Sequence, residues 1–82
     1  MKVIRFTASW CQPCKMLAKN LEEVKTNIPI NVIDIDEHSD VAIEYGIRGV
    51  PTLLKIDENN NVISKLVGMT SLKQLQDWFD ND

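Results

Sequence analysis

The sequence predicts an α/β fold: a four-stranded mixed sheet with helices on both faces. Short β-branched apolar runs alternate with stretches of helical periodicity, in the order β-α-β-α-β-β-α. The first strand–helix–strand unit implies a parallel pair of strands, because a helical crossover returns the chain in the same direction. A polar turn later in the chain joins two further strands as an antiparallel hairpin.

The first half of the chain provides the parallel pair. Residues 2–7 are short, apolar and β-branched, which is typical of a strand. Residues 12–26 are expected to form a helix, because leucine and valine recur at spacings of four and three between positions 17 and 24 and make one apolar stripe. Residues 30–35 are a second apolar run and predict the neighbouring strand.

The second half provides the hairpin and two more helices. Residues 39–45 predict a short helix that stops at Gly46. Residues 52–57 and 61–67 predict the strands of the hairpin. A last helix is expected after Ser71, which forms a capping box with the glutamine three residues on.

Length and composition predict one small domain over residues 1–82, with one core. The formal net charge of −3 argues against a nucleic-acid-binding surface, which would need clustered basic residues. No apolar stretch reaches membrane-spanning length, and the N-terminus has neither an apolar core nor a cleavage site of a secretory signal. We therefore expect a cytoplasmic protein, although the mature form of an exported protein would have the same composition. We also expect a monomer.

The two cysteines, Cys11 and Cys14, lie where the first strand meets the first helix. A helix start offers unpaired N–H groups and the positive end of the helix dipole, and both favour a thiolate. A disulfide closing so short a loop would stabilise little as a structural staple. Structural zinc needs four ligands, and His38 is the chain's single histidine, with no second cysteine pair. We therefore expect dithiol–disulfide chemistry and no metal.

Three segments resemble the thioredoxin family. Residues 10–15, Trp-Cys-Gln-Pro-Cys-Lys, resemble its redox motif, with Gln12 where the commonest form has glycine. Residues 45–54 resemble the segment that carries the family's cis-proline, here Pro51, and Gly68 resembles the glycine that borders the substrate groove. The chain begins at the strand that leads into the redox motif, so it is similar to compact thioredoxins and glutaredoxins without the opening strand and helix. The resemblance covers nearly the whole chain and implies a minimal thioredoxin fold.

The resemblance implies a protein-disulfide oxidoreductase. Cys11, at the exposed helix start, would be the nucleophile, and the more shielded Cys14 would be the resolving thiol. The resemblance implies no bound cofactor. Electrons would come from a flavin- and NADPH-dependent thioredoxin reductase. The partners would be disulfide-containing proteins, including ribonucleotide reductase. If the bond before Pro51 is cis, the backbone of Val50 can pair with an extended substrate. The expected substrate-binding residues are Trp10, Gln12, Pro13, Gly49, Val50, Pro51, Gly68 and Met69, of which Trp10 and Met69 could instead be core residues.

The chain departs from the family at Arg5. The family usually has a buried aspartate at this position and a lysine partner at the position of Val32. A cation in this place needs a partner, and we predict an ion pair of Arg5 with Asp34 or Asp36. Arg5 and Lys15 would favour the thiolate and make the protein more oxidising.

Other functions remain open from the sequence. A glutaredoxin-like protein that uses glutathione fits the small size, but such proteins more often carry an aromatic residue between the proline and the second cysteine. A non-catalytic interaction module would keep its function without either cysteine. A metal carrier is a further alternative, which a metal-content measurement would distinguish.

Overall fold

The structure, a computed structural model, describes residues 1–81 and confirms the predicted order of elements; the last residue of the predicted domain lies outside this range. None of the helices within residues 1–81 has the length and apolar character needed to cross a bilayer. The strands are β1 (Lys2–Thr7), β2 (Ile30–Asp34), β3 (Thr52–Ile56) and β4 (Val62–Val67), and the helices are α1 (Gln12–Glu22), α2 (Ser39–Glu44) and α3 (Leu72–Asp80).

Helix α1 ends at Glu22 rather than at the predicted residue 26. The N–H groups of Glu23 and Val24 donate to the carbonyls of Asn20 and Leu21, three residues back, so the chain leaves the helix through a tight turn. Val24 still packs against the core, which explains why the apolar spacing continued past the helix end.

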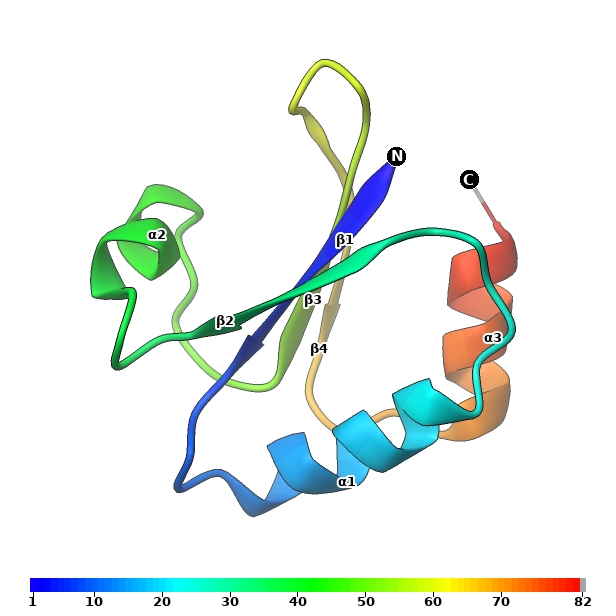
Figure 1. The fold of residues 1–82 in the computed structure, drawn as a ribbon, viewed down its shortest axis with the longest axis horizontal. Coiled ribbons are helices and arrows are strands. Elements are labelled where there is room, and N and C mark those ends of the chain that lie inside the picture. The colour runs from blue at the N-terminus through cyan, green and yellow to red at the C-terminus, as the bar shows by residue number, and fades with distance from the viewer. Residues whose placement is uncertain (82) are drawn as a thin grey trace.

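The four strands form one mixed sheet in the order β2-β1-β3-β4 (Figure 1). β1 pairs with β2 in parallel and with β3 antiparallel, and β4 completes the antiparallel hairpin. The carboxylate of Asp57 accepts the N–H groups of Asn59 and Asn61, each at 2.9 Å, and thereby closes the hairpin turn. The predicted sheet is therefore confirmed.

Helices cover both faces of the sheet, with α1 and α3 on one side and α2 on the other (Figure 1). Successive side chains of a strand point to opposite faces, so β1 and β3 each contribute to two apolar clusters. The cluster under α1 and α3 contains Val3, Leu17, Leu53, Leu75 and Phe79, whereas that under α2 contains Ile4, Phe6, Ala42, Leu54 and Ile56.

The sheet face under α3 also holds a buried lysine that the sequence analysis did not single out. Lys55 is 1% exposed, and its ammonium donates to the backbone carbonyls of Trp78 and Asn81 at the end of α3. The Nζ atom also lies 4.5 Å from the centroid of the Trp78 ring. A cation here is favourable because the last carbonyls of a helix lack intrahelical partners and form the negative end of its dipole.

Helix α3 begins with the predicted capping box. The hydroxyl of Ser71 accepts the N–H of Gln74 at 3.2 Å, and the Gln74 side chain accepts the N–H of Ser71 at 3.4 Å. We expect Ser71→Ala to lower the free energy of unfolding by about 1 kcal/mol, because one helical N–H loses its acceptor. Urea denaturation measures this loss. Ser39→Ala, which removes an exposed hydroxyl without a hydrogen bond, is the matched control, and equal effects of the two changes would contradict the capping role.

Candidate active site

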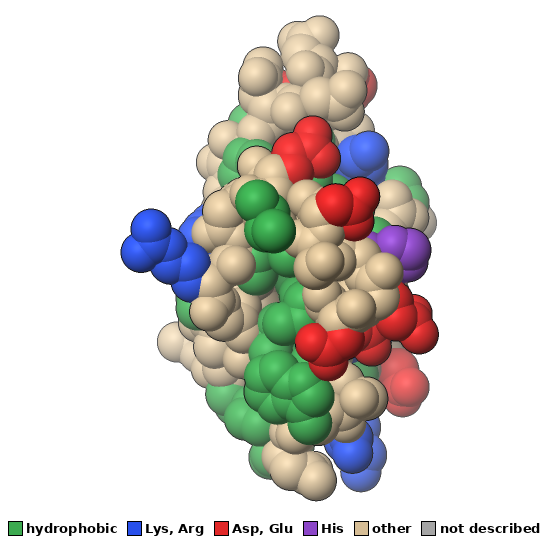
Figure 2. All heavy atoms as spheres, turned by 90° about the vertical axis from the view of Figure 1, so that its left-hand side faces the viewer, with side chains coloured by type: hydrophobic (Ala, Val, Ile, Leu, Met, Phe, Trp, Pro, Cys, Tyr) green, Lys and Arg blue, Asp and Glu red, His purple; other side chains and the backbone are tan. Residues whose placement is uncertain are grey.

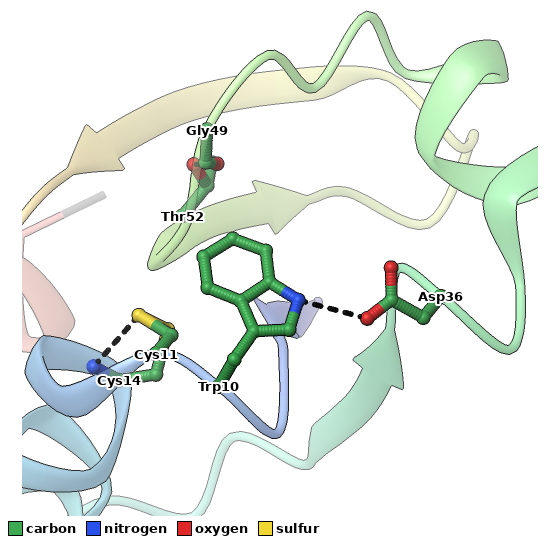
Figure 3. Close-up of a disulfide and its surroundings, with 6 residues drawn as sticks. All are labelled: Trp10, Cys11, Cys14, Asp36, Gly49 and Thr52. Atoms are coloured by element: carbon green, nitrogen blue, oxygen red, sulfur yellow. Dashed lines mark hydrogen bonds between the residues drawn. A yellow bond between two sulfur atoms is a disulfide. The ribbon is translucent and has the colours of Figure 1, made fainter.

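The two cysteines form a disulfide at the first turn of α1 (Figure 3). Cys11 is the N-cap residue, with an extended backbone, and its Sγ atom accepts the N–H of Cys14 at 3.2 Å. Pro13 occupies the first helical turn, where a missing N–H leaves no hydrogen bond unmade. Sγ of Cys11 therefore lies where a backbone N–H and the helix dipole both stabilise negative charge on sulfur.

Cys11 is less accessible than the sequence suggested. Cys11 was expected to be exposed, but in the disulfide form only 4% of its surface is exposed, against 1% for Cys14. The reason is packing: Ala8 precedes the turn, and Ile35 and Val50 cover the disulfide from the other segments. The prediction of an exposed Cys11 is therefore wrong, while the prediction that Cys14 is the more shielded of the two is confirmed.

A loop before β3 lies against the disulfide, since Val50 packs on it. The Val50–Pro51 peptide bond is cis, as the resemblance implied. The carbonyl of Pro51 accepts the N–H of Gly68 at 2.9 Å, and the hydroxyl of Thr52 donates to the carbonyl of Gly49 at 2.8 Å. No hydrogen bond within residues 1–81 uses the backbone N–H or C=O of Val50, which is thus available to a ligand.

Trp10 is a surface residue, because 65% of its area is exposed. Its indole N–H donates to Oδ2 of Asp36 at 2.9 Å, and the two side chains point toward one another in Figure 3. The N–H of Asp36 in turn donates to Oδ1 of Asp34 at 2.8 Å. The core alternative for Trp10 is therefore wrong. The contact of Trp10 with Asp36 was missed, because nothing in the sequence pairs residues from these two segments.

The remaining predicted groove residues differ in exposure: Gln12, Pro13, Gly49 and Met69 are exposed, Val50 and Gly68 are half-buried, and Pro51 is buried. Gln12 and Pro13 are exposed on the first turn of α1, and Met69 is 47% exposed, so a core position for Met69 is wrong as well. The segment that carries Met69 is held to α1, because the Asn20 amide donates to the carbonyl of Thr70 at 3.1 Å. The role of Asn20 was not predicted, because nothing in the sequence pairs this helix residue with the segment around Thr70.

A hollow of about 260 Å³ lies behind the disulfide, lined by Arg5, Lys15, Asp34 and Cys14 among others. The expectation that Arg5 points toward the space behind Cys14 is therefore confirmed. Burial lowers the pKa of the Arg5 guanidinium from its ordinary value. Because arginine starts from so high a pKa, this side chain stays charged at neutral pH.

The predicted ion pair of Arg5 is wrong, since none of the ion pairs within residues 1–81 includes it. The strand register explains this result. Val32 lies opposite Arg5 on β2, while Asp34 lies opposite Thr7, two residues further along. Asp36 is turned toward Trp10 instead. Within the described part of the chain, no three or more His, Cys, Asp and Glu side chains gather as a metal site would require.

Comparison with known proteins identifies the family. The family model described as Thioredoxin matches residues 1–81. The chain belongs to the thioredoxin family. Among curated thioredoxins, it is 37% identical to that of Pseudomonas aeruginosa over 82 residues, which cover 95% of this chain and 75% of the relative. It is 41% identical to the mitochondrial thioredoxin of Mus musculus over 78 residues, 90% of this chain. The chain spans about half the length of such mammalian relatives, 46% in this case.

Solved thioredoxins share the fold. A mutant thioredoxin from Halobacterium salinarum NRC-1 superposes with a TM-score of 0.87 at 34% identity, over 95% of this chain and 70% of that one. Thioredoxin 1 from Thermosipho africanus superposes with a TM-score of 0.83 at 23% identity, over 98% of this chain and 91% of that one. The four-stranded sheet with its three helices, as far as residues 1–81 describe it, is therefore a thioredoxin fold.

Proposed function

We propose that this thioredoxin-family chain is a thiol–disulfide oxidoreductase that reduces disulfides in proteins through Cys11 and Cys14. The observation that carries the proposal is the disulfide at the N-cap of α1, where Sγ of Cys11 accepts a backbone N–H. This position stabilises a thiolate, which is the form of cysteine that attacks disulfides.

The first step is attack by the thiolate of Cys11 on one sulfur of the substrate disulfide. A mixed disulfide forms, and the other substrate sulfur leaves as a thiolate that takes up a proton. Cys11 is the better candidate for this step, because it caps the helix and is the less buried of the two cysteines.

In the second step Cys14 loses its proton and attacks the Sγ atom of Cys11. The second substrate sulfur leaves as a thiol, and the Cys11–Cys14 disulfide forms. Two electrons thus pass from the dithiol to the substrate. The two cysteines are already close enough for this bond, with Cα atoms 5.3 Å apart.

The exposed surface beside the disulfide would hold the substrate. An extended substrate segment can pair with the free backbone of Val50, a short case of strand addition. Trp10 and Met69 add exposed apolar area to this groove. The flexible thioether of Met69 suits partners of varied shape. Gln12, Pro13, Gly49, Pro51 and Gly68 complete the proposed groove.

Re-reduction of the disulfide needs an electron donor, for which we propose a flavin- and NADPH-dependent thioredoxin reductase rather than a bound cofactor. Partners would be disulfide-containing proteins, with ribonucleotide reductase as a family example. We further propose that the chain works as a cytoplasmic monomer in electron transport and redox homeostasis.

An insulin reduction assay tests this function. Precipitation of reduced insulin is followed with NADPH and thioredoxin reductase in one arm, and with glutathione and glutathione reductase in the other. We expect turnover in the first arm. Turnover with glutathione alone would favour a glutaredoxin-like protein, and no turnover in either arm, nor with dithiothreitol as donor, would refute the proposal.

Arg5 and Lys15 are proposed to tune the redox potential from the hollow behind Cys14. A cation beside the dithiol stabilises the thiolate and hence the reduced form, which makes the protein more oxidising. We expect Arg5→Ala to lower the midpoint potential by about 10–20 mV, which corresponds to less than 1 kcal/mol for a two-electron couple.

The midpoint is measured by equilibration with glutathione buffers. Arg5→Lys keeps the charge and should retain most of the wild-type value, and Lys65→Ala removes an exposed cation of β4 as a control. An unchanged or raised midpoint for Arg5→Ala would contradict the proposed role.

A further inference from the structure

An acidic surface lies next to the proposed groove. The segment 34–44, from the end of β2 to the end of α2, holds five carboxylates and neither lysine nor arginine. Four of these are exposed, and we call them the acidic rim: Asp36, Glu37, Asp40 and Glu44. None of them belongs to an ion pair within residues 1–81, so the chain leaves their charge uncompensated at close range.

The acidic rim is continuous with the apolar surface at the disulfide. Asp36 accepts the indole N–H of Trp10 at 2.9 Å, and Trp10 directly precedes Cys11 (Figure 3). On the face shown in Figure 2, hydrophobic side chains run down the centre and acidic side chains flank them on the right. A polypeptide that reaches the disulfide across Trp10 therefore passes beside carboxylates.

Other ionisable groups near the groove do not cancel this charge. His38 lies within the rim segment, Lys15 follows Cys14, and Arg48 precedes Gly49. The four rim carboxylates outnumber these two cations taken together with Arg5, which lines the hollow behind Cys14. The rim carboxylates also come from one segment of the chain, residues 34–44, whereas Lys15 and Arg48 come from two other segments, α1 and the α2–β3 loop.

We propose that the chain prefers polypeptide disulfides flanked by lysine or arginine, with the basic residues placed against the acidic rim. The inference rests on the proposed function, because the rim would bias the same exchange reaction. Opposite charges beside a reactive site raise the local concentration of the partner and its association rate. The effect falls with salt, since the Debye length shrinks from about 30 Å at 0.01 M to about 3 Å at 1 M.

Two disulfide peptides of equal length test this preference, one with lysines and one with glutamates on both sides of the same cystine. The second-order rate constant for oxidation of the reduced protein is measured with each peptide and divided by the rate constant for hydroxyethyl disulfide, which is uncharged. We expect the lysine peptide to react about fivefold or more faster at 20 mM salt, and the ratio to fall below about twofold at 0.5 M.

Charge-reversal variants locate the effect. Glu37→Lys with Asp40→Lys should abolish or invert the preference for the lysine peptide. Glu22→Lys with Glu23→Lys changes the net charge equally at the far end of α1 and should leave the ratio unchanged. Equal peptide rates in the wild type, or equal effects of both double variants, would overturn the inference. Failure to react with hydroxyethyl disulfide would instead overturn the proposed function.

Discussion

Replacing Cys14 with serine is expected to stop catalytic turnover and to trap the substrate on the protein. Cys11 can still attack the substrate disulfide, but no internal thiol releases the mixed disulfide that forms. We expect insulin reduction to fall at least about 100-fold, because both cysteines act in one chemical sequence. The trapped complex is detected as a covalent adduct on a non-reducing gel and by mass spectrometry.

Cys11→Ser is the matched variant. It removes the same disulfide but also the attacking sulfur, so we expect no turnover and no adduct. The contrast between the two variants separates nucleophile from resolving thiol. An adduct with Cys11→Ser and none with Cys14→Ser would reverse the roles proposed from the N-cap position and the burial of the two residues.

Lys55→Met is expected to destabilise the folded chain. Methionine keeps much of the apolar volume but cannot donate to the carbonyls of Trp78 and Asn81, to which the Lys55 ammonium donates. Removing a charged donor and leaving part-buried acceptors unpaired costs about 2–4 kcal/mol. Urea denaturation measures the loss as a lower midpoint with an unchanged slope.

Lys65→Met serves as the control for Lys55→Met. Lys65 lies on the neighbouring strand β4 and is exposed, so its replacement should change stability by no more than about 0.5 kcal/mol. If Lys55→Met were as stable as Lys65→Met, the buried ammonium would contribute nothing net to α3. Some buried charges behave in this way when an apolar residue replaces them.

The fold was predictable because its signals are local. Three local features predicted it: the apolar spacing, the capping box at Ser71 and the helix stop at Gly46. Each involves residues only a few positions apart, and all three are present in the structure. The end of α1 was misplaced by four residues, whereas the ends of β2, α2 and β3 and the start of β4 each differ from the prediction by one. At the end of α1 the apolar stripe continued through Val24, although the backbone had already turned.

The candidate site was predictable only in part. The spacing of Cys11 and Cys14 and their place at a helix start are properties of one short segment. The burial of Cys11 was not predictable, because Ile35 and Val50 cover it from distant segments. The partner of Asp36 was also assigned wrongly, since the register of β2 against β1 decides that Arg5 faces Val32.

For this chain, residues close in sequence dictate the order of strands and helices, the position of the dithiol and the family to which it belongs. Packing in three dimensions decides where each charged side chain lies. Lys55 binds the end of α3, Asp36 accepts a hydrogen bond from Trp10, and Arg5 lines the hollow behind Cys14. The physical reason is range. Backbone preferences and apolar periodicity act between near neighbours, whereas the burial and partners of a charged side chain depend on strands and helices that meet only in the folded sheet.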